Sequence, residues 1–538
     1  MITQLKKTIA LGVILVLGMT SMIKGVQAQD IQTNMLKFGR LLQLIESNYV
    51  DTTNIDDLTE KAVVEVLKQL DPHSVYISKE EVEKMNEPLQ GSFEGIGISF
   101  NILKDTLMVV ATIPGGPSEK VGLQAGDRIV EVDEKKVAGI GLENSDVFEM
   151  LRGDKGTVVN LKVLRKRNEE LLDFRIIRDK IPIHSLDASY MINDETGYIK
   201  LNRFSATTTD EFSEAIRTLK QNPKLENLVL DLRGNGGGYL KAAIELADQF
   251  LGAFKMIVYT EGENNRRKDY KASALGEFEQ GKLVVLIDEG SASASEIVAG
   301  AIQDWDRGVV IGRRSFGKGL VQQPYFLNDG SMLRLTTAHY YTPSGRCIQK
   351  AYDDGVEAYR SDYRKRFEAG EFFTQDSIHF NDSLTYETLI NKRTVYGGGG
   401  VMPDIFVPMD TSIHYGFFNR MNRQNIVYST ALDYLDKNRD KFTKKYSSFD
   451  LFREKFSVED ELVDRMLAEA EKEGIEQEEG DADFARPIIK EQVKALIARD
   501  LFGQSEFYQI INEDNDVIRE ALKVLKDSSE YNHLLVEN

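Results

Sequence analysis

The sequence predicts a multidomain α+β protein in which an α/β core is flanked by a β-rich segment and by helical regions at both ends. Its 538 residues, 41% of them hydrophobic, suffice for several domains with separate cores. From residue 195 onward, strand patterns alternate with helical patterns, which is typical of βαβ units and a parallel sheet. Towards both ends of the chain, apolar residues recur at helical spacing.

Residues 1–28 have the three parts of a secretory signal. Lys6 and Lys7 form its charged start, residues 9–19 are apolar, and residues 26–28 (V-Q-A) offer small side chains for cleavage. This apolar run is too short to span a bilayer comfortably, although an uncleaved membrane anchor stays open as the alternative. We therefore expect an exported protein.

Composition argues against several kinds of partner and site. The formal charge is −19, which disfavours nucleic acid and anionic membrane surfaces as partners. The single cysteine, Cys347, rules out an internal disulfide. The histidines never fall in H-x-x-x-H or H-E-x-x-H spacing, so a zinc protease is unsupported and we expect no metal or other cofactor. No G-x-S-x-G elbow surrounds a serine, which argues against an α/β-hydrolase triad.

Residues 31–90 are expected to form an N-terminal helical region. Residues 36–45 and 58–70 carry apolar residues at helical spacing, and the sequence D-P-H-S at 71–74 then begins a turn. A single histidine in a turn is usually structural, so His73 is not assigned to catalysis.

Residues 411–538 are expected to form a helical C-terminal extension. Residues 452–472 and 487–501 are apolar at helical spacing, and the charged residues 471–480 between them indicate a solvated loop. No role beyond structure is predicted for this extension.

The stretch from Lys282 to Gln323 contains the residues best suited to chemistry. Residues 283–287 predict a buried strand, residues 296–302 a helix, and residues 308–312 a second strand. Ser293 lies where the first strand passes into the helix, and Lys318 lies on the loop after the second strand. Because parallel strands bring their C-terminal loops to one edge of a sheet, we expect this hydroxyl and this amine to meet.

Both residues also have a purely structural interpretation. Ser293 with Glu296 fits the capping box S-x-x-E, in which the serine is a helix N-cap. A lysine between two glycines, as Lys318 is, usually lies on a solvated loop. Their sequence context favours chemistry instead.

That context is S-A-S-A-S-E-I at residues 291–297 and F-G-K-G at residues 316–319. It resembles the Ser-Lys carboxy-terminal processing proteases, the periplasmic tail-specific family. The resemblance implies that Ser293 is the nucleophile and Lys318 the general base, with Gln322 in support. The steps of 25 residues from Ser293 to Lys318 and of four to Gln322 match the family.

The chemistry explains these residue types. A serine hydroxyl needs an adjacent base, and a lysine can act as one only if its pKa falls several units from about 10.4. Phe316, Leu320 and Val321 are expected to bury Lys318, and the Gln322 amide can orient its amine without adding charge. Asp304 matches a family acidic position and is expected to support structure rather than chemistry.

A glycine loop follows the predicted strand 228–232 and precedes the predicted helix 239–250. Its sequence, R-G-N-G-G-G at 233–238, is not a nucleotide-binding motif but resembles the family's D-L-R-x-N-x-G-G loop. Backbone N–H groups beside a helix N-terminus can stabilise an oxyanion. We expect Gly237 and Ala294 to supply these groups.

Residues 92–178 change to short strand patterns. They contain G-I-G-I at 95–98, G-L-Q-A-G-D-R-I at 122–129 and L-R-G at 151–153, which resemble a circularly permuted bacterial PDZ domain. Such a domain adds a C-terminal peptide as a strand, with the terminal carboxylate held by a loop. Gly95, Ile96, Gly97 and Ile98 are expected to form that loop.

The resemblance covers residues 31–408 and places a ClpP/crotonase-related protease core at 180–408. It includes Y-Y-T-P-S-G at 340–345 and G-V-M-P-D at 400–404, while residues 350–395 are expected to be an insertion or a long excursion.

The resulting prediction is an exported, periplasmic serine endopeptidase. It would capture the C-terminal tails of protein substrates through its PDZ domain and cleave them through an acyl-enzyme on Ser293. The alternatives are a PDZ scaffold whose protease core is inactive or closed and, with less support, a small-molecule acyl hydrolase. Protein or peptide substrates are the expected partners, and a homo-oligomer and an adaptor or activator protein stay open.

Overall fold

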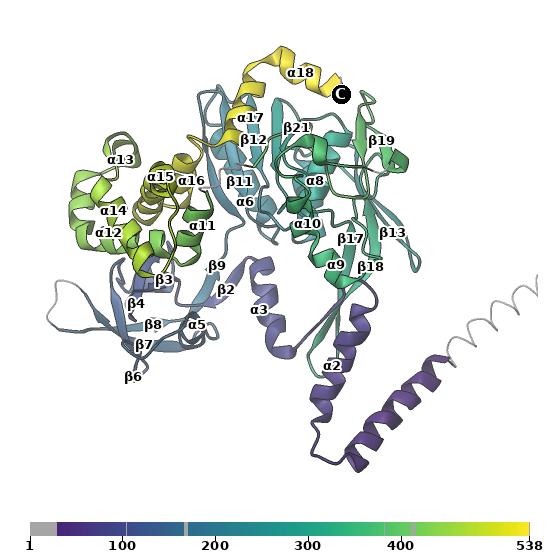
Figure 1. Cartoon of the computed structure of the whole chain (residues 1–538), viewed down its shortest axis with the longest axis horizontal. Coiled ribbons are helices and arrows are strands. Elements are labelled where there is room, and N and C mark those ends of the chain that lie inside the picture. Colours follow the sequence, from purple (N-terminus) through teal and green to yellow (C-terminus); the bar gives the residue numbers. More distant parts are fainter. Residues whose placement is uncertain (1–29, 104, 166–169, 381, 410–414, 537–538) are drawn as a thin grey trace, which may run out of the picture. The chain divides into compact units, whose positions relative to one another are not determined.

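The computed structural model describes residues 30–536 apart from 104, 166–169, 381 and 410–414 (Figure 1). The predicted signal, residues 1–28, lies outside the described residues. The chain divides into two compact units, residues 1–76 and 77–538. Within the described part of the chain, no helix combines the length and the apolar character that crossing a bilayer requires.

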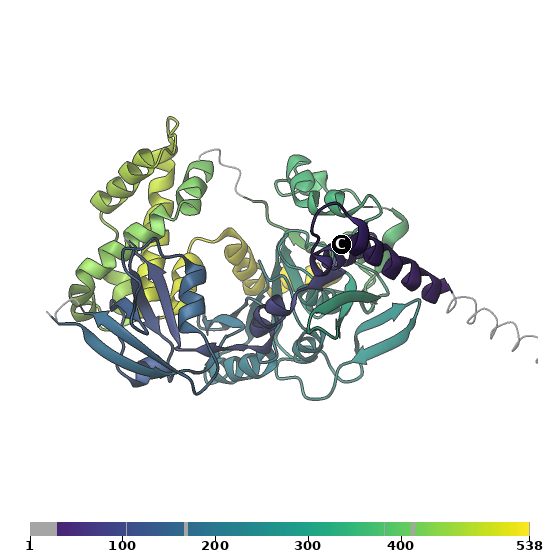
Figure 2. The ribbon, with the colours of Figure 1, turned by 90° about the horizontal axis from the view of Figure 1, so that it is seen from below.

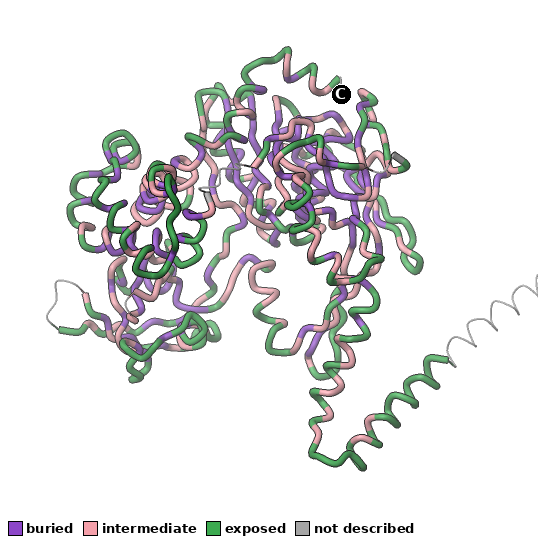
Figure 3. Tube along the Cα trace, viewed as in Figure 1, coloured by how far each residue is buried: buried purple, intermediate pink, exposed green. Residues whose placement is uncertain are grey.

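The first unit contains two helices, over residues 30–48 and α2 (Ile55–Lys68), as predicted. Asn54 caps α2, accepting hydrogen bonds from the Asp56 and Asp57 amides. Apolar residues along the first helix, among them Met35 and Leu36, are exposed, and the tube of this helix is mostly green in Figure 3. In the predicted turn, Asp71 Oδ1 accepts from the His73 and Ser74 amides, so the backbone of His73 has a structural role.

The second unit begins with α3 (Lys79–Gln90), followed by a β-rich domain. In this domain α5 (Asn144–Leu151) accompanies a sheet of order β3-β4-β5-β7-β8, with β6 paired to β5. The domain is closed where β2 (Ser92–Gly95) pairs with β9 (Asp179–Pro182). The sheet strands are β3 (Ile98–Ile102), β4 (Leu107–Thr112), β5 (Arg128–Val132), β6 (Lys135–Lys136), β7 (Val158–Leu164) and β8 (Leu172–Ile177).

The central sheet has the order β10-β11-β12-β15-β16-β21. Its strands from β11 to β21 are parallel, and β10 runs antiparallel at the edge. The predicted parallel arrangement of the two strands around Ser293 is therefore confirmed. The strands are β10 (Leu186–Met191), β11 (Thr196–Leu201), β12 (Asn227–Asp231), β15 (Lys282–Ile287), β16 (Val309–Gly312) and β21 (Ile405–Phe406).

Helices cover both faces of this sheet. Alternate strand residues such as Leu230 and Val285 pack with α6 (Thr208–Leu219), α7 (Leu240–Asp248) and α8 (Ala294–Asp304). On the other face, Val229 and Val284 pack against the C-terminal helices α17 and α18. These two helices span Asp516–Lys526 and Ser528–Val536. Part of the predicted C-terminal extension thus completes the α/β core.

A second sheet holds β13 (Met256–Gly262), β14 (Asn265–Lys271), β17 (Leu320–Phe326) and β18 (Met332–Tyr341). The predicted insertion at 350–395 contains short elements: α9 (Val356–Arg360), α10 (Asp362–Glu368), η1 (Gln375–Ser377), η2 (Asp382–Leu384), β19 (Thr385–Glu387) and β20 (Thr394–Tyr396).

The remaining C-terminal helices, light green to yellow in Figure 2, share one hydrophobic core. The prediction of a single helix over 452–472 is wrong, because the chain breaks between α13 and α14. Phe456 and Val458 at the break are buried, and the Phe456 ring stacks on Phe452 with centroids 4.8 Å apart. The helices are α11 (Tyr415–Arg423), α12 (Ile426–Lys445), α13 (Phe449–Lys455), α14 (Asp460–Lys472), α15 (Asp481–Leu501) and α16 (Gln504–Ile511).

Candidate active site

One cavity of about 400 Å³ at the C-terminal edge of the central sheet brings the predicted catalytic residues together. The glycine loop after β12, the turn after β15 and the loop between β16 and β17 all reach it. The predicted residues that line it are Gly237, Ser293, Ala294, Lys318 and Gln322.

Ser293 lies at the sharp turn between β15 and α8. Its backbone has φ 56° and ψ −108°, a conformation that a residue with a side chain rarely adopts. The Ser293 amide donates to Glu296 Oε2 at 2.7 Å, and the Ser293 carbonyl accepts from the Tyr340 hydroxyl at 3.1 Å. The surrounding hydrogen bonds therefore hold Ser293 in a strained position at the cavity wall.

Glu296 connects the Ser293 turn to the Lys318 loop. Its Oε2 accepts from the Ser293 and Lys318 amides at 2.7 and 2.9 Å. Its Oε1 accepts from the Gly317 amide at 2.7 Å and from the Ser315 hydroxyl at 2.5 Å. Burial raises the pKa of this fully buried carboxyl to about 7, while the four donors favour the ionised form.

One of these four hydrogen bonds, from the Ser293 amide to Glu296, can be predicted from the capping pattern S-x-x-E in the sequence. The other three come from residues 315–318, which follow a different strand, so sequence spacing alone could not indicate them.

Lys318 faces Gln322, which lies on β17. Its Nζ donates to Gln322 Oε1 at 3.0 Å, and its carbonyl accepts from the Tyr340 hydroxyl at 2.6 Å. Leu320 and Val321 line the same cavity, as expected. Phe316 is not among the residues that line this cavity, and its ring lies 3.9 Å from Lys350 Nζ, in a cation–π contact. The apolar residues that line the cavity also include Leu240, Ile297 and Met332.

The glycine loop closely approaches the Ser293 turn. A Cβ at Gly237 would come within 2.8 Å of the Ala292 carbonyl oxygen and 3.0 Å of the Ala294 nitrogen, so glycine is required there. The Gly237 amide, however, already donates to Asn235 Oδ1 at 2.9 Å. Gly238 also lines the cavity, and its amide has no hydrogen-bond partner among the described residues. Of these two amides, that of Gly238, one residue beyond the predicted Gly237, is thus the one without another hydrogen bond among the residues described.

Asp304 lies at the C-terminal end of α8, fully buried. It forms an ion pair with Arg346 at 2.8 Å and accepts from the Ser344 amide at 2.9 Å. It does not line the Ser293 cavity, which fits the expected structural role.

The predicted PDZ loop lines a small cavity of about 40 Å³ together with the apolar residues Phe100, Val147, Phe148 and Leu151. Gly97 adopts a left-handed φ of 74°, and the Ile96 carbonyl accepts from the Ser118 amide and hydroxyl. The loop residues lining this cavity are Gly95, Ile96, Gly97 and Ile98.

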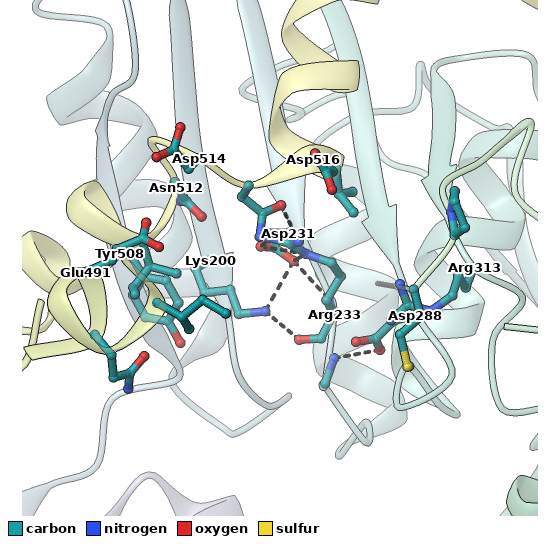
Figure 4. Close-up of a pocket in the computed structure, with 18 of the residues that line it drawn as sticks. Lys200, Asp231, Arg233, Asp288, Arg313, Glu491, Tyr508, Asn512, Asp514 and Asp516 are labelled. Carbon is teal, nitrogen blue, oxygen red and sulfur yellow. Dashed lines mark hydrogen bonds and ion pairs between the residues drawn. The ribbon is translucent and has the colours of Figure 1, made fainter. Parts of the chain in front are cut away.

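A larger cavity, which the sequence did not indicate, lies at the same edge of the sheet (Figure 4). Its volume is about 1230 Å³. Lys200, Asp231, Arg233, Asp288 and Arg313 line it from the sheet, and α15, α16, α17 and their connections line it from the C-terminal region. The C-terminal residues labelled in Figure 4 are Glu491, Tyr508, Asn512, Asp514 and Asp516.

Comparisons with known proteins agree with this architecture. Residues 195–358 match peptidase family S41, residues 108–165 match the PDZ domain, and residues 417–503 match a family of unknown function.

The chain is 38% identical over 336 residues to a carboxy-terminal-processing protease of Bartonella bacilliformis, covering 60% of this chain and 76% of that protein. It is 35% identical over 319 residues to the carboxy-terminal processing protease CtpB of Bacillus subtilis, covering 59% of this chain and 66% of that protein.

A solved photosystem II D1 C-terminal processing protease aligns with 58% of this chain and 90% of its own, at 28% identity and a TM-score of 0.34. The chain belongs to the carboxy-terminal processing proteases, serine-type peptidases of family S41 that carry a PDZ domain.

Proposed function

We propose that the protein is an endopeptidase in which Ser293 is the nucleophile and Lys318 the general base. The observation that carries this proposal is the shared carboxylate: Glu296 Oε2 accepts from the amides of both residues, beside one cavity. This arrangement fixes the two backbones relative to each other. Preorganised groups of this kind are what nucleophilic catalysis requires.

In this mechanism, Ser293 Oγ attacks the scissile carbonyl carbon while the neutral Lys318 amine accepts the hydroxyl proton. The amides of Ala294 and Gly238 donate to the oxyanion of the tetrahedral intermediate. The intermediate collapses to an acyl-enzyme as Lys318 returns the proton to the departing amine. Water, deprotonated by the same lysine, then releases the acyl group and restores Ser293. Gln322 orients the Lys318 amine through its side-chain carbonyl oxygen.

The PDZ domain would select the substrate by its C-terminal tail. The tail would pair with an exposed strand edge, with its carboxylate at the Gly95–Ile98 loop and its last apolar side chain in the adjoining cavity. Apolar side chains such as Val147 and Leu151 favour an apolar terminal residue.

Export, a periplasmic location and self-association are further parts of the proposal. The pattern of residues 1–28 supports export. The exposed apolar side chains of the helix over residues 30–48 support contact with a second copy or with an adaptor. Size measurement by light scattering on the mature chain would test self-association.

The test of the peptidase is degradation of an unfolded protein with an apolar C-terminal tail. We expect wild type and Lys268→Ala, which alters an exposed lysine on β14, to degrade it. Ser293→Ala and Lys318→Ala should each lower the rate by about 10³-fold or more. A matched substrate ending in two aspartates should be degraded more slowly, because an apolar pocket excludes charge.

Activity surviving in Lys318→Ala, with circular dichroism showing a folded protein, would refute the lysine base. Tail binding without cleavage by wild type would favour the PDZ scaffold with a closed core. Equal degradation of both tails would refute tail selection but not the peptidase.

A further inference from the structure

The glycine loop beside Ser293 is contacted by a residue from the C-terminal tail. Asn515 precedes α17, and its Oδ1 accepts from the Ile518 amide at 3.2 Å, which caps the helix. The same oxygen accepts from Arg233 Nη1 at 2.9 Å. Arg233 is the first residue of the loop that ends at Gly237 and Gly238, so one side chain links the tail to this loop.

Arg233 is also anchored within the sheet (Figure 4). Its Nε and Nη2 donate to the Asp231 carboxylate at 3.0 and 2.6 Å, and Lys200 donates to Asp231 and to the Arg233 carbonyl. Burial acts to raise the pKa of Asp231, but Arg233 and Lys200 hold it below its usual range. The Asp231–Arg233 pair therefore stays ionised, and Asn515 accepts from the one remaining terminal nitrogen of this guanidinium.

The loop beyond Arg233 is held by hydrogen bonds to its neighbours, with the fully buried Asn235 at its centre. Three of its residues are consecutive glycines, and glycine has the largest conformational freedom of any residue. At the glycines the anchors are backbone amides: the Gly234 amide donates to Asp288 Oδ1 at 2.8 Å, and the Gly237 amide donates to Asn235 Oδ1 at 2.9 Å. Arg233 adds the anchor at the start of the loop, and its position sets where the chain enters the glycines that line the Ser293 cavity.

Helix α17 gives Asn515 a fixed position. Val517, Ile518, Ala521, Val524 and Leu525 are buried against the face of the central sheet opposite α8. Residue 515 lies outside the segments that match the peptidase, PDZ and unknown-function families. The tail is thus seated on the core independently of the Arg233 contact.

We propose that Asn515 is a positioning residue for the peptidase site: by holding Arg233, it fixes the glycine loop in the geometry that presents its amides to the oxyanion. The C-terminal helices then complete the active site as well as covering the sheet. This inference rests on the proposed acyl transfer at Ser293.

The two roles of Asn515 can be separated by substitution. Serine and aspartate both cap helices well, so Asn515→Ser and Asn515→Asp should both preserve the start of α17. The shorter serine side chain, however, cannot reach Arg233 from the same position. Aspartate keeps an acceptor at the required distance and adds charge complementary to the guanidinium.

The experiment measures kcat and KM for a peptide substrate in the full-length chain. We expect Asn515→Ser to lower kcat about tenfold, a fraction of the loss on removing a whole oxyanion donor, with KM within about twofold. Asn515→Asp should restore kcat to within about twofold, and both variants should keep the wild-type melting temperature. Affinity for a peptide aldehyde, which forms an oxyanion on Ser293, should fall in Asn515→Ser and recover in Asn515→Asp. Ser448→Ala, which removes the cap of α13, is the matched control and should leave kcat unchanged.

Unchanged kcat in Asn515→Ser would overturn the inference, as would an Asn515→Asp variant that is equally impaired while folded. Loss of activity that follows a lower melting temperature in both variants would show a purely structural role and would overturn it too. A wild-type protein that does not cleave peptides would instead overturn the proposed function, on which the inference depends.

Discussion

The Ser293 cavity and the larger cavity lie at the same edge of the central sheet, but the carboxyl groups beside them, Glu296 and Glu491, differ in their contacts. Glu296 accepts four hydrogen bonds. Glu491, which lines the larger cavity, has no hydrogen-bond or ion-pair partner among the described residues, and Asp514 and Glu513 lie near it. Burial raises the pKa of each to about 7.

Glu296 and Glu491 therefore have similar pKa values but contribute to the stability of the fold in opposite directions. Glu296 joins two loops, and its removal would leave four donors without an acceptor. Partial burial and the neighbouring like charges make the ionised Glu491 carboxylate destabilising, and no hydrogen bond or ion pair offsets this effect among the described residues. The three substitutions below test this contrast.

Glu296→Gln should have the largest effect. The amide group of glutamine would place a donor against backbone donors, which we expect to lower the free energy of unfolding by about 3 kcal/mol. Peptidase activity should fall about 100-fold, because the Ser293 turn and the Lys318 loop lose their common anchor. Denaturant unfolding and peptide hydrolysis measure the two effects.

Glu491→Gln serves as the matched control for that substitution, since it makes the same chemical change beside the other cavity. A Glu296→Gln variant with wild-type stability would contradict the role assigned to the four hydrogen bonds.

Tyr340→Phe, beside the Ser293 cavity, should affect stability and activity less than Glu296→Gln does. The hydroxyl donates to the carbonyls of Ser293 and Lys318, so its loss should lower stability by about 1–2 kcal/mol and activity several-fold. Thermal unfolding and hydrolysis rates would measure this. Tyr341→Phe, which changes the next residue of β18, should be near neutral because that ring stacks on Tyr259. Equal effects of the two substitutions would argue against a specific hydroxyl contribution.

Glu491→Gln should have the smallest effect and the opposite sign. The folded-state pKa of about 7 exceeds the ordinary value of 4.5, so the folded protein binds this proton more tightly than the unfolded chain. The carboxyl thus lowers stability progressively between about pH 4.5 and 7, and fully above that range. Because the group is only half-buried, we expect the substitution to stabilise by about 1 kcal/mol at pH 8 and by nothing at pH 4.

Chemical unfolding at the two pH values would measure this difference. Destabilisation at pH 8 would show that Glu491 has a favourable contact, and the contrast between the cavities would fail.

The sequence by itself determined the elements of the core and the positions of the residues suited to chemistry. The sequence indicated β12, β15 and β16 through short apolar runs that end at turn residues. Such runs can be recognised because burial and backbone preference act over a few neighbouring residues. The parallel order then placed Ser293 and Lys318 at one edge of the sheet, where the structure has them. The predicted catalytic roles of these residues stay predictions until the substitutions are measured.

Tertiary structure alone decided how the site is held. Packing decides which loops and side chains meet. It brings Glu296 to the Lys318 loop, Asn235 to the Gly237 amide, and the Phe316 ring to Lys350. The Asn515–Arg233 hydrogen bond spans 282 residues of sequence. Periodicity and motif spacing describe short-range order, so contacts between distant segments become visible only when the sheet and its covering helices are assembled.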